Sequence, residues 1–385
     1  MGNLNNLGGF VVLRHLEKLK RLHWPLVFVL TTIAVIGTVL LYGAAGGSMD
    51  PHAGRHISRF VFGLVVAALM ATFDPRFFYQ LAYPLYIFAL LLLVLVDIIG
   101  FTAMGATRWL DVGFIRIQPS ELMKVGIVLA LARFYHSRPP GAASTLVNMA
   151  VPVMLMAMPA ALVMLQPDLG TAMLMIFIGT GLMFAAGVTW KFFALGIASA
   201  LAMLPVAWSL LHDYQRQRVL TFLDPDRDPL GAGYHVMQSK IAIGSAGFWG
   251  KGYMEGSQSH LLFLPEKHTD FIFTLMTEDF GMAGALVLIG LYVFLLLLCI
   301  SISMRCRSQF LLLTVMGVTI TFFVYSFINV SMVLGLLPVV GVPLPLVSFG
   351  GTSMLTLMVG MGLVLNAHVH RDLYMPGSPG IKSAR

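Results

Sequence analysis

The sequence predicts an all-α integral membrane protein with about ten transmembrane helices and a large extracytoplasmic loop between the seventh and eighth spans. Three observations support this fold class. Apolar residues (Ala, Val, Ile, Leu, Met, Phe, Trp, Tyr and Cys) make up 58% of the 385 residues. Charged residues make up only 11%, against roughly 25% in soluble domains. The apolar residues also gather in runs close to the length, about 20 residues, that a helix needs to cross a bilayer.

This composition excludes a disordered chain and an ordinary soluble enzyme. The net charge of +7 does not indicate a nucleic-acid partner, because its meaning depends on where the charges lie and they do not form one basic patch.

The apolar runs divide the chain into three parts. Residues 1–24 are expected to form a cytoplasmic N-terminal segment that lies in the membrane interface, with apolar and basic faces. Residues 25–367 are expected to form the membrane domain, which includes the large loop at 211–273, and residues 368–385 a cytoplasmic tail. We expect spans near residues 25–45, 58–73, 77–99, 119–136, 147–165, 170–187, 191–210, 274–300, 309–329 and 350–367.

The distribution of charge predicts the orientation of these spans. With a cytoplasmic N-terminus, 13 of the 24 Lys and Arg residues but only three of the 17 Asp and Glu residues fall on the inside. This asymmetry follows the positive-inside rule. An even number of spans then places both termini in the cytoplasm, and most of the polar chemistry lies at the outer face of the membrane.

The strongest functional signal is the run LPEKHTDFIF, in which His268, Thr269 and Asp270 come just before an apolar helix. Asp270 should therefore sit at the outer membrane boundary. Partial desolvation there would raise the pKa of its carboxyl towards that of a useful general base. Helix capping alone also explains an aspartate at this position, so the spacing leaves both interpretations open.

A second signal, QPSELMK, places Ser120, Glu121 and Lys124 at the start of a span. Glu121 and Lys124 are three residues apart, so they share one helix face. Ions inside a membrane normally face a polar interior. The pair therefore either lines an outward cavity or holds the bundle together as a structural ion pair. Arg108 and Trp109 would reach the same cavity, where a cation beside an aromatic ring suits a diphosphate on an apolar chain.

Three further segments carry polar residues at the outer end. Asp168 lies in a short turn before a span, where helix capping is the favoured interpretation. Lys240, in the long loop, is either a phosphate contact or an ordinary solvated lysine. Residues 341–353, which include Ser348, combine two prolines with a Gly-Gly pair. Such a segment indicates non-helical backbone that is buried or lines a cavity. The sequence contains no HExxH or CxxC motif, so its metal ligands, if any, are unknown.

Taken together and in this order, four motifs resemble the SEDS family of bacterial cell-wall polymerases (shape, elongation, division and sporulation proteins). The motifs are QPSELMK, QPDLGTA, LPEKHTDFIF and NVSMVLGLLPVVGVPLPLVSFGGTS. The resemblance runs from about residue 25 to residue 371. The form GVPLP and the short N-terminus resemble the elongation member of the family, and the division member is its nearest relative. Phe349, where tyrosine is common, and Ala246, in a Gly-Ser-Gly-Gly run, are conservative departures.

The resemblance implies ten spans with both termini in the cytoplasm of a bacterial cell, and a peptidoglycan glycosyltransferase in the inner membrane. Its substrate would be lipid II, an undecaprenyl-linked disaccharide-peptide, polymerised on the outer face during elongation and shape maintenance. The essential loop aspartate of the family maps onto Asp270, its Glu-Lys pair onto Glu121 and Lys124, and its loop arginine onto Arg108. The partners implied are a class B penicillin-binding protein, which is a transpeptidase, and membrane proteins of the elongation complex.

These assignments give a mechanistic hypothesis. Asp270 would take the proton from the attacking 4-hydroxyl, and undecaprenyl diphosphate would leave with inversion in a single displacement. Arg108, Lys124 and Lys240 are candidates to stabilise the leaving group, together with a divalent cation such as Mg²⁺ or Mn²⁺. Two other classes stay open: a flippase for lipid-linked sugars, and a scaffold whose loops only recruit a partner. A flippase would be expected to have polar residues along the whole length of the helix bundle, whereas the ionisable residues of this sequence gather at its outer end.

Overall fold

Ten helices coincide with the ten apolar ranges expected from the sequence. The computed structural model describes residues 17–103, 106–111, 116–138, 146–210, 213–224, 231–256 and 268–375. The ten helices are α2 (Trp24–Ala44), α3 (Ala53–Thr72), α4 (Pro75–Ile99), α5 (Pro119–His136), α6 (Leu146–Leu165), α7 (Leu169–Ala185), α8 (Trp190–Leu210), α12 (Ile272–Met304), α13 (Gln309–Val333) and α14 (Gly351–Val369). The largest difference at a helix start is at α3, which begins five residues earlier than expected and includes Arg55 and His56.

Seven of the helices in the described residues are long and apolar enough to cross a membrane, so the chain is a multi-pass membrane protein. Two more, α7 and α8, contain shorter apolar stretches. The remaining one, α5, carries Glu121, Lys124 and Arg133. The count of ten spans stays a prediction, and so do the three domain boundaries. The expected interfacial segment falls mostly on residues 1–16, which lie outside the described residues.

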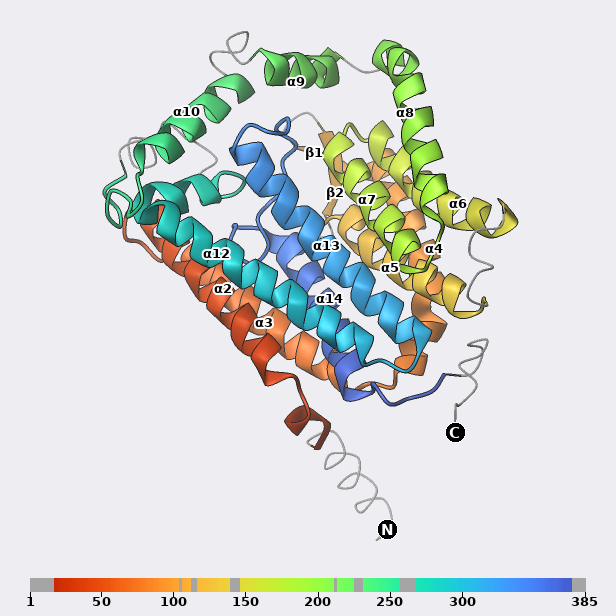
Figure 1. Cartoon of the computed structure of the whole chain (residues 1–385). Coiled ribbons are helices and arrows are strands. Elements are labelled where there is room, and N and C mark those ends of the chain that lie inside the picture. The colour runs from red at the N-terminus through yellow and green to blue at the C-terminus, as the bar shows by residue number, and fades with distance from the viewer. Residues whose placement is uncertain are drawn as a thin grey trace.

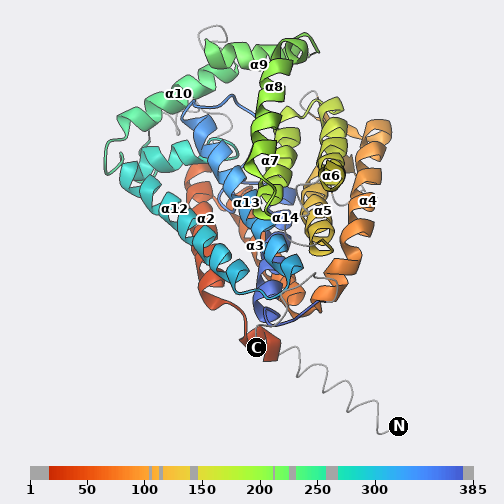
Figure 2. The ribbon, with the colours of Figure 1, turned by 45° about the vertical axis from the view of Figure 1, so that its right-hand side comes forward.

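The helices form one bundle, with α13 and α14 in its interior (Figure 1). Viewed from another side, α8 stands in front of the other helices (Figure 2), and most of its described side chains are exposed. The described chain begins and ends at the same end of the bundle, where the rings of His23 and His368 lie 4.7 Å apart. The opposite end is the one that α9 and α10 cover (Figure 1).

The segment between α4 and α5 is not a simple loop. Its strands β1 (Phe101–Ala103), β2 (Ala106–Asp111) and β3 (Arg116–Ile117) form a small antiparallel sheet in the order β1-β2-β3. Leu110 pairs with Ile117, which brings the end of the sheet back to the start of α5. The sequence analysis did not predict these strands, although the sheet leaves the protein all-α in its membrane domain.

The large outer loop contains two helices, α9 (Asp213–Leu223) and α10 (Ala232–Ser245). They lie across the end of the bundle between α8 and α12 (Figure 1). The buried hydroxyl of Ser239 in α10 contacts the Thr274 hydroxyl at 2.7 Å and donates to the Val333 carbonyl at 2.9 Å. These contacts attach α10 to the outer ends of α12 and α13.

A kink at Gly281 divides α12 and receives the end of the outer loop. Gly281 has φ 68° and ψ −166°, which only glycine adopts readily. At the kink, Lys251 N donates to the Glu278 carbonyl at 3.0 Å, and Gly252 N donates to the Asp279 carbonyl at 3.1 Å. The Lys251 ammonium also lies 2.8 Å from the fully buried Glu278 carboxylate. The kink and the loop therefore depend on each other.

We predict that Gly281→Ala destabilises the protein by about 1–3 kcal/mol or more, because alanine at this φ is strained. A Cβ at this position would also lie 2.3 Å from Gly250 N and 2.4 Å from the Phe248 carbonyl oxygen. The measurement is thermal unfolding in detergent. Gly290→Ala in the same helix is the matched control, because its Cβ would meet nothing within 4 Å. Equal melting temperatures for the two variants would contradict the role of the kink.

Candidate active site

A polar cavity of about 260 Å³ lies at the end of the bundle beneath the outer loop. Its walls come from six parts of the chain that are distant in sequence: β2, the start of α5, the start of α7, the turn before α12, the outer half of α13, and the segment that leads into α14. The polar and charged side chains lining it are Arg108, Trp109, Gln118, Glu121, Lys124, Asp168, Thr171, Thr269, Asp270, Tyr325, Thr352 and Ser353. The cavity therefore joins all four motifs of the sequence analysis.

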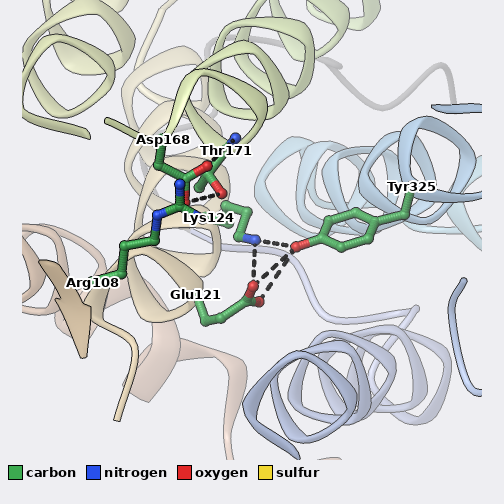
Figure 3. A network of polar contacts seen from close by, with 6 residues as sticks. All are labelled: Arg108, Glu121, Lys124, Asp168, Thr171 and Tyr325. Atoms are coloured by element: carbon green, nitrogen blue, oxygen red, sulfur yellow. Dashed lines mark hydrogen bonds and ion pairs between the residues drawn. The ribbon is translucent and has the colours of Figure 1, made fainter. Parts of the chain in front are cut away.

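Glu121 and Lys124 form a buried ion pair on α5, as their spacing predicts. The Lys124 ammonium donates to the Glu121 carboxylate at 2.7 Å, and their side chains are only 2% and 9% exposed. Tyr325 of α13 completes the group: its hydroxyl accepts from Lys124 and lies 3.2 Å and 3.4 Å from the two Glu121 oxygens (Figure 3). The pair is thus both a structural contact between α5 and α13 and part of the cavity wall.

Arg108 and Asp168 form a second ion pair beside the first (Figure 3). The Arg108 Nε atom lies 3.4 Å from Asp168 Oδ2, and its guanidinium donates to the Pro167 carbonyl at 2.7 Å. Asp168 also caps α7, accepting from Thr171 N at 3.2 Å and from the Thr171 hydroxyl at 2.9 Å. The capping interpretation of Asp168 is therefore confirmed, and this carboxylate in addition neutralises the arginine of the cavity.

Asp270 lines the cavity from the turn that precedes α12. The N-cap of α12 is Phe271, and no side chain caps this helix, so Asp270 does not act as its N-cap. Its backbone is fixed instead: the Asn329 amide donates to the Asp270 carbonyl at 2.9 Å and to the Val342 carbonyl at 2.7 Å. Gly341 lies beside the carboxylate: a Cβ at Gly341 would meet Asp270 Oδ2 at 3.5 Å, an ordinary contact distance.

The segment 334–350 is non-helical and half-buried or buried over most of its length, as its prolines and glycines predict. Ser348 holds it to the turn before α12, since its hydroxyl accepts from Leu344 N at 2.8 Å and donates to the Thr269 carbonyl at 2.6 Å. Both contacts of this hydroxyl go to backbone. The geometry therefore gives Ser348, expected as a substrate contact, a role in positioning the turn that carries Asp270.

The other expected residues divide into two groups. Trp109 and Thr269 line the cavity, whereas Ser120, His268 and Lys240 do not. Ser120 is buried, and Lys240 is exposed on α10 with its side chain against Gly335. The His268 ring stacks on His52 at 4.3 Å. Burial, followed by the charges of His268 and Arg55, lowers the pKa of His52 below its usual value, which favours its neutral form at pH 7.

Tyr325, Asn329 and Gln118 belong to the site although they were not predicted from the sequence. Tyr325 and Asn329 lie one turn apart on α13, within an apolar run. A buried tyrosine or asparagine in a predicted span is a signal of polar surroundings, but it does not identify the partner. Within the described residues, no group of three His, Cys, Asp or Glu side chains is arranged to hold a metal ion.

An apolar groove of about 590 Å³ adjoins the cavity between α7 and α13. Consecutive residues line the two spaces: Gly170 and Val324 face the groove, and Thr171 and Tyr325 face the cavity. The groove walls include Phe177, Phe184, Ile320, Phe323 and Phe327. This arrangement suits a ligand with a charged head and a long apolar tail.

Comparison with known proteins identifies the same family as the sequence motifs. The profile of the family FTSW_RODA_SPOVE, described as "Cell cycle protein", matches residues 21–373. The peptidoglycan glycosyltransferase MrdB of Escherichia coli (strain K12) is 43% identical over 354 residues, which cover 90% of this chain and 94% of that protein.

Two solved structures have the same fold. A chain from the structure titled "Structural coordination of polymerization and crosslinking by a peptidoglycan synthase complex" is 34% identical, with a TM-score of 0.79 over 91% of this chain and 98% of that one. The rod shape determining protein RodA of Thermus thermophilus is 30% identical, with a TM-score of 0.69 over 92% of this chain and 98% of that one. The family match spans nearly the whole chain, so this protein belongs to the FtsW/RodA/SpoVE family, which is the SEDS family that its motifs resemble.

Proposed function

We propose that this protein is a peptidoglycan glycosyltransferase that polymerises lipid II into glycan strands during cell elongation and shape maintenance. The observation that carries the proposal is the placement of Asp270 in one cavity with Arg108 and Lys124, next to an apolar groove. Lipid II has the matching parts: a sugar that reacts, a diphosphate that leaves, and an undecaprenyl tail. The similarity to MrdB and RodA supports the elongation role over that of the division member, FtsW.

Asp270 is the general base of this mechanism. Its carboxylate accepts the proton of the attacking 4-hydroxyl while the bond from the anomeric carbon to the diphosphate oxygen breaks. One base and a good leaving group suffice for a single displacement with inversion, so no second nucleophilic carboxylate is needed. The backbone contacts from Asn329 and Ser348 hold the Asp270 turn in place for this step.

Arg108 and Lys124 stabilise the charge that develops on the leaving diphosphate. Arg108 is the more accessible of the two, with its side chain 29% exposed against 2% for Lys124. Each is already paired with a carboxylate, so the substrate must share them with Asp168 and Glu121. Thr269 and Trp109 lie in the same wall and would contact the sugars. His268, Ser120 and Lys240 do not line the cavity, so the mechanism assigns them no direct contact with the substrate.

A divalent cation, Mg²⁺ or Mn²⁺, is compatible with this site only if the substrate supplies most of its ligands. The described residues offer no three-ligand cluster, and the carboxylates of Glu121 and Asp168 are engaged by cations. Asp270 would hold such an ion together with the diphosphate. When bound, the ion would offset negative charge on the phosphates. Mg²⁺ commonly binds in this manner, through one or two carboxylates and the substrate phosphates.

The same reasoning gives the location and the partners. The positive-inside charge distribution supports cytoplasmic termini and an active site on the outer face of the bacterial inner membrane. Newly made strands must be crosslinked, and the similar chain from a synthase complex that coordinates polymerisation and crosslinking supports a class B penicillin-binding protein as partner. Other membrane proteins of the elongation complex are expected around it. A flippase for lipid-linked sugars is the alternative from another class, and it requires no base at Asp270.

We predict that Asp270→Asn abolishes polymerisation, because asparagine cannot accept the proton. The assay incubates the purified protein, with its partner transpeptidase if needed, with lipid II and Mg²⁺, and resolves glycan strands on a gel. Asp372→Asn is the control: this aspartate is 78% exposed and forms only loose surface ion pairs at the other end of the bundle. Strands of equal length from wild type and Asp270→Asn would refute the base assignment.

We predict that Lys124→Gln destabilises the protein by about 3–5 kcal/mol, because it leaves the buried Glu121 carboxylate uncompensated. Glu121→Gln in the same chain should restore the melting temperature, since no buried charge remains. If Lys124 also binds the diphosphate, the double variant folds but still makes strands at least tenfold more slowly. Recovery of both stability and activity in the double variant would limit the pair to a structural role.

A further inference from the structure

The N-terminus of α14 forms a wall of the cavity and carries no cap. Residues Phe349 to Ser353 line the cavity, and the N-cap, Gly350, has no side chain to accept from the helix amides. Within the described part of the chain, the amides of Gly351, Thr352 and Ser353 have no hydrogen-bond acceptor. Free amides and the positive end of the helix dipole together favour an anion.

Ser353 is an independent sign that a ligand belongs there. Its side chain is 8% exposed and lines the cavity, and its hydroxyl has no partner among the described residues. A hydroxyl that faces a cavity without a protein partner can donate to, or accept from, a ligand that enters it. A Cβ at Gly350 would lie 2.5 Å from the Ser353 Oγ, so the position next to this hydroxyl is kept free by a glycine.

Arg59 of α3 adds a positive charge that has no counter-ion among the described residues. Its guanidinium lies 4.8 Å from the centre of the Phe349 ring, and about 3.3–3.5 Å from where a Cβ on Gly351 would be. One of its nitrogens, Nη1, is fully buried without an acceptor. Arg108 and Lys124, in contrast, each have a carboxylate partner. Arg59 does not itself line the cavity, but its guanidinium lies directly behind Gly351 and beside Phe349, which do. Its positive charge therefore adds to that of the α14 N-terminus at this wall of the cavity.

We propose that the first turn of α14, with Arg59 and Ser353, is a second anion-binding site of the cavity, and that it takes the diphosphate of a lipid-linked sugar. The inference rests on the proposed function. A polymerase that joins two lipid-linked sugars holds two diphosphates at once, and one of them leaves. The site at β2 and α5 serves one diphosphate, and the site at α3 and α14 serves the other. A polyanion matches three amides, one hydroxyl and one guanidinium better than a single carboxylate does.

The test measures binding of radiolabelled farnesyl diphosphate to the purified full chain in detergent. Arg59→Gln is expected to weaken binding by about tenfold or more, the loss typical of one charge-assisted hydrogen bond. Ser353→Ala should weaken it by less, and Arg59→Lys, which keeps the charge, should retain most of the affinity. Arg76→Gln removes an exposed charge at the start of α4, at the other end of the bundle, and should bind as wild type does. Wild-type affinity in both Arg59→Gln and Ser353→Ala would overturn the proposal.

Competitors identify the occupant. Excess pyrophosphate should displace farnesyl diphosphate in part, and farnesol should not; equal competition by farnesol would show that only the tail is bound and would overturn the proposal. Stronger displacement by phosphatidylglycerol would assign the site to a phospholipid headgroup and overturn its assignment to substrate. Strand synthesis from lipid II by the wild type is assayed in parallel. Its absence, with Arg59-dependent binding intact, would reject the proposed function but keep the anion site.

Discussion

Two ion pairs, Lys124 with Glu121 and Arg108 with Asp168, allow charged side chains to lie inside the outer end of an apolar bundle. An unpaired ion in such surroundings is expensive, and an opposite charge in contact with further hydrogen bonds offsets the cost. The pairs also connect elements that are distant in sequence: β2 with the start of α7, and α5 with Tyr325 of α13. The need to neutralise charge therefore determines which segments surround the cavity.

The non-helical segment 334–350 places the Asp270 carboxylate, the base of the proposed mechanism, relative to these pairs. Backbone without helical hydrogen bonds is tolerated at membrane depth only where protein groups satisfy it. Asn329 and Ser348 do so here, and the same contacts hold the backbone of Thr269 and Asp270. A single set of hydrogen bonds thus stabilises the irregular segment and fixes the position of Asp270. The kink at Gly281, tied to the outer loop through Lys251, supports the same end of α12.

Local sequence predicted the parts of this site but not their assembly. Apolar run length located the ten helices, and i,i+3 spacing located the Glu121–Lys124 pair, since both properties act within one helix. Contacts between helices have no such local signal, so Tyr325 and the counter-ion of Arg108 could not be predicted. Arg59 is different, because the sequence shows an arginine at the edge of an expected span. Its importance follows only from the structure, in which its buried Nη1 has no acceptor. Apolar flanking residues made Lys240 a candidate, although it lies away from the cavity.

The order of polar and apolar surfaces explains why sugar chemistry can occur at this depth. Thr171 and Tyr325 face the polar cavity, and the residues just before them in sequence face the apolar groove. The helices α7 and α13 therefore line both spaces, and the polar and apolar surfaces meet between adjacent residues. A ligand whose tail lies in the groove therefore has its phosphates next to the cations. Because the bilayer already restricts the motion of such a ligand, less entropy is lost when the protein positions it. The protein then needs few side chains for the reaction itself: one base, a site for each diphosphate, and a wall that keeps the reacting sugars between them.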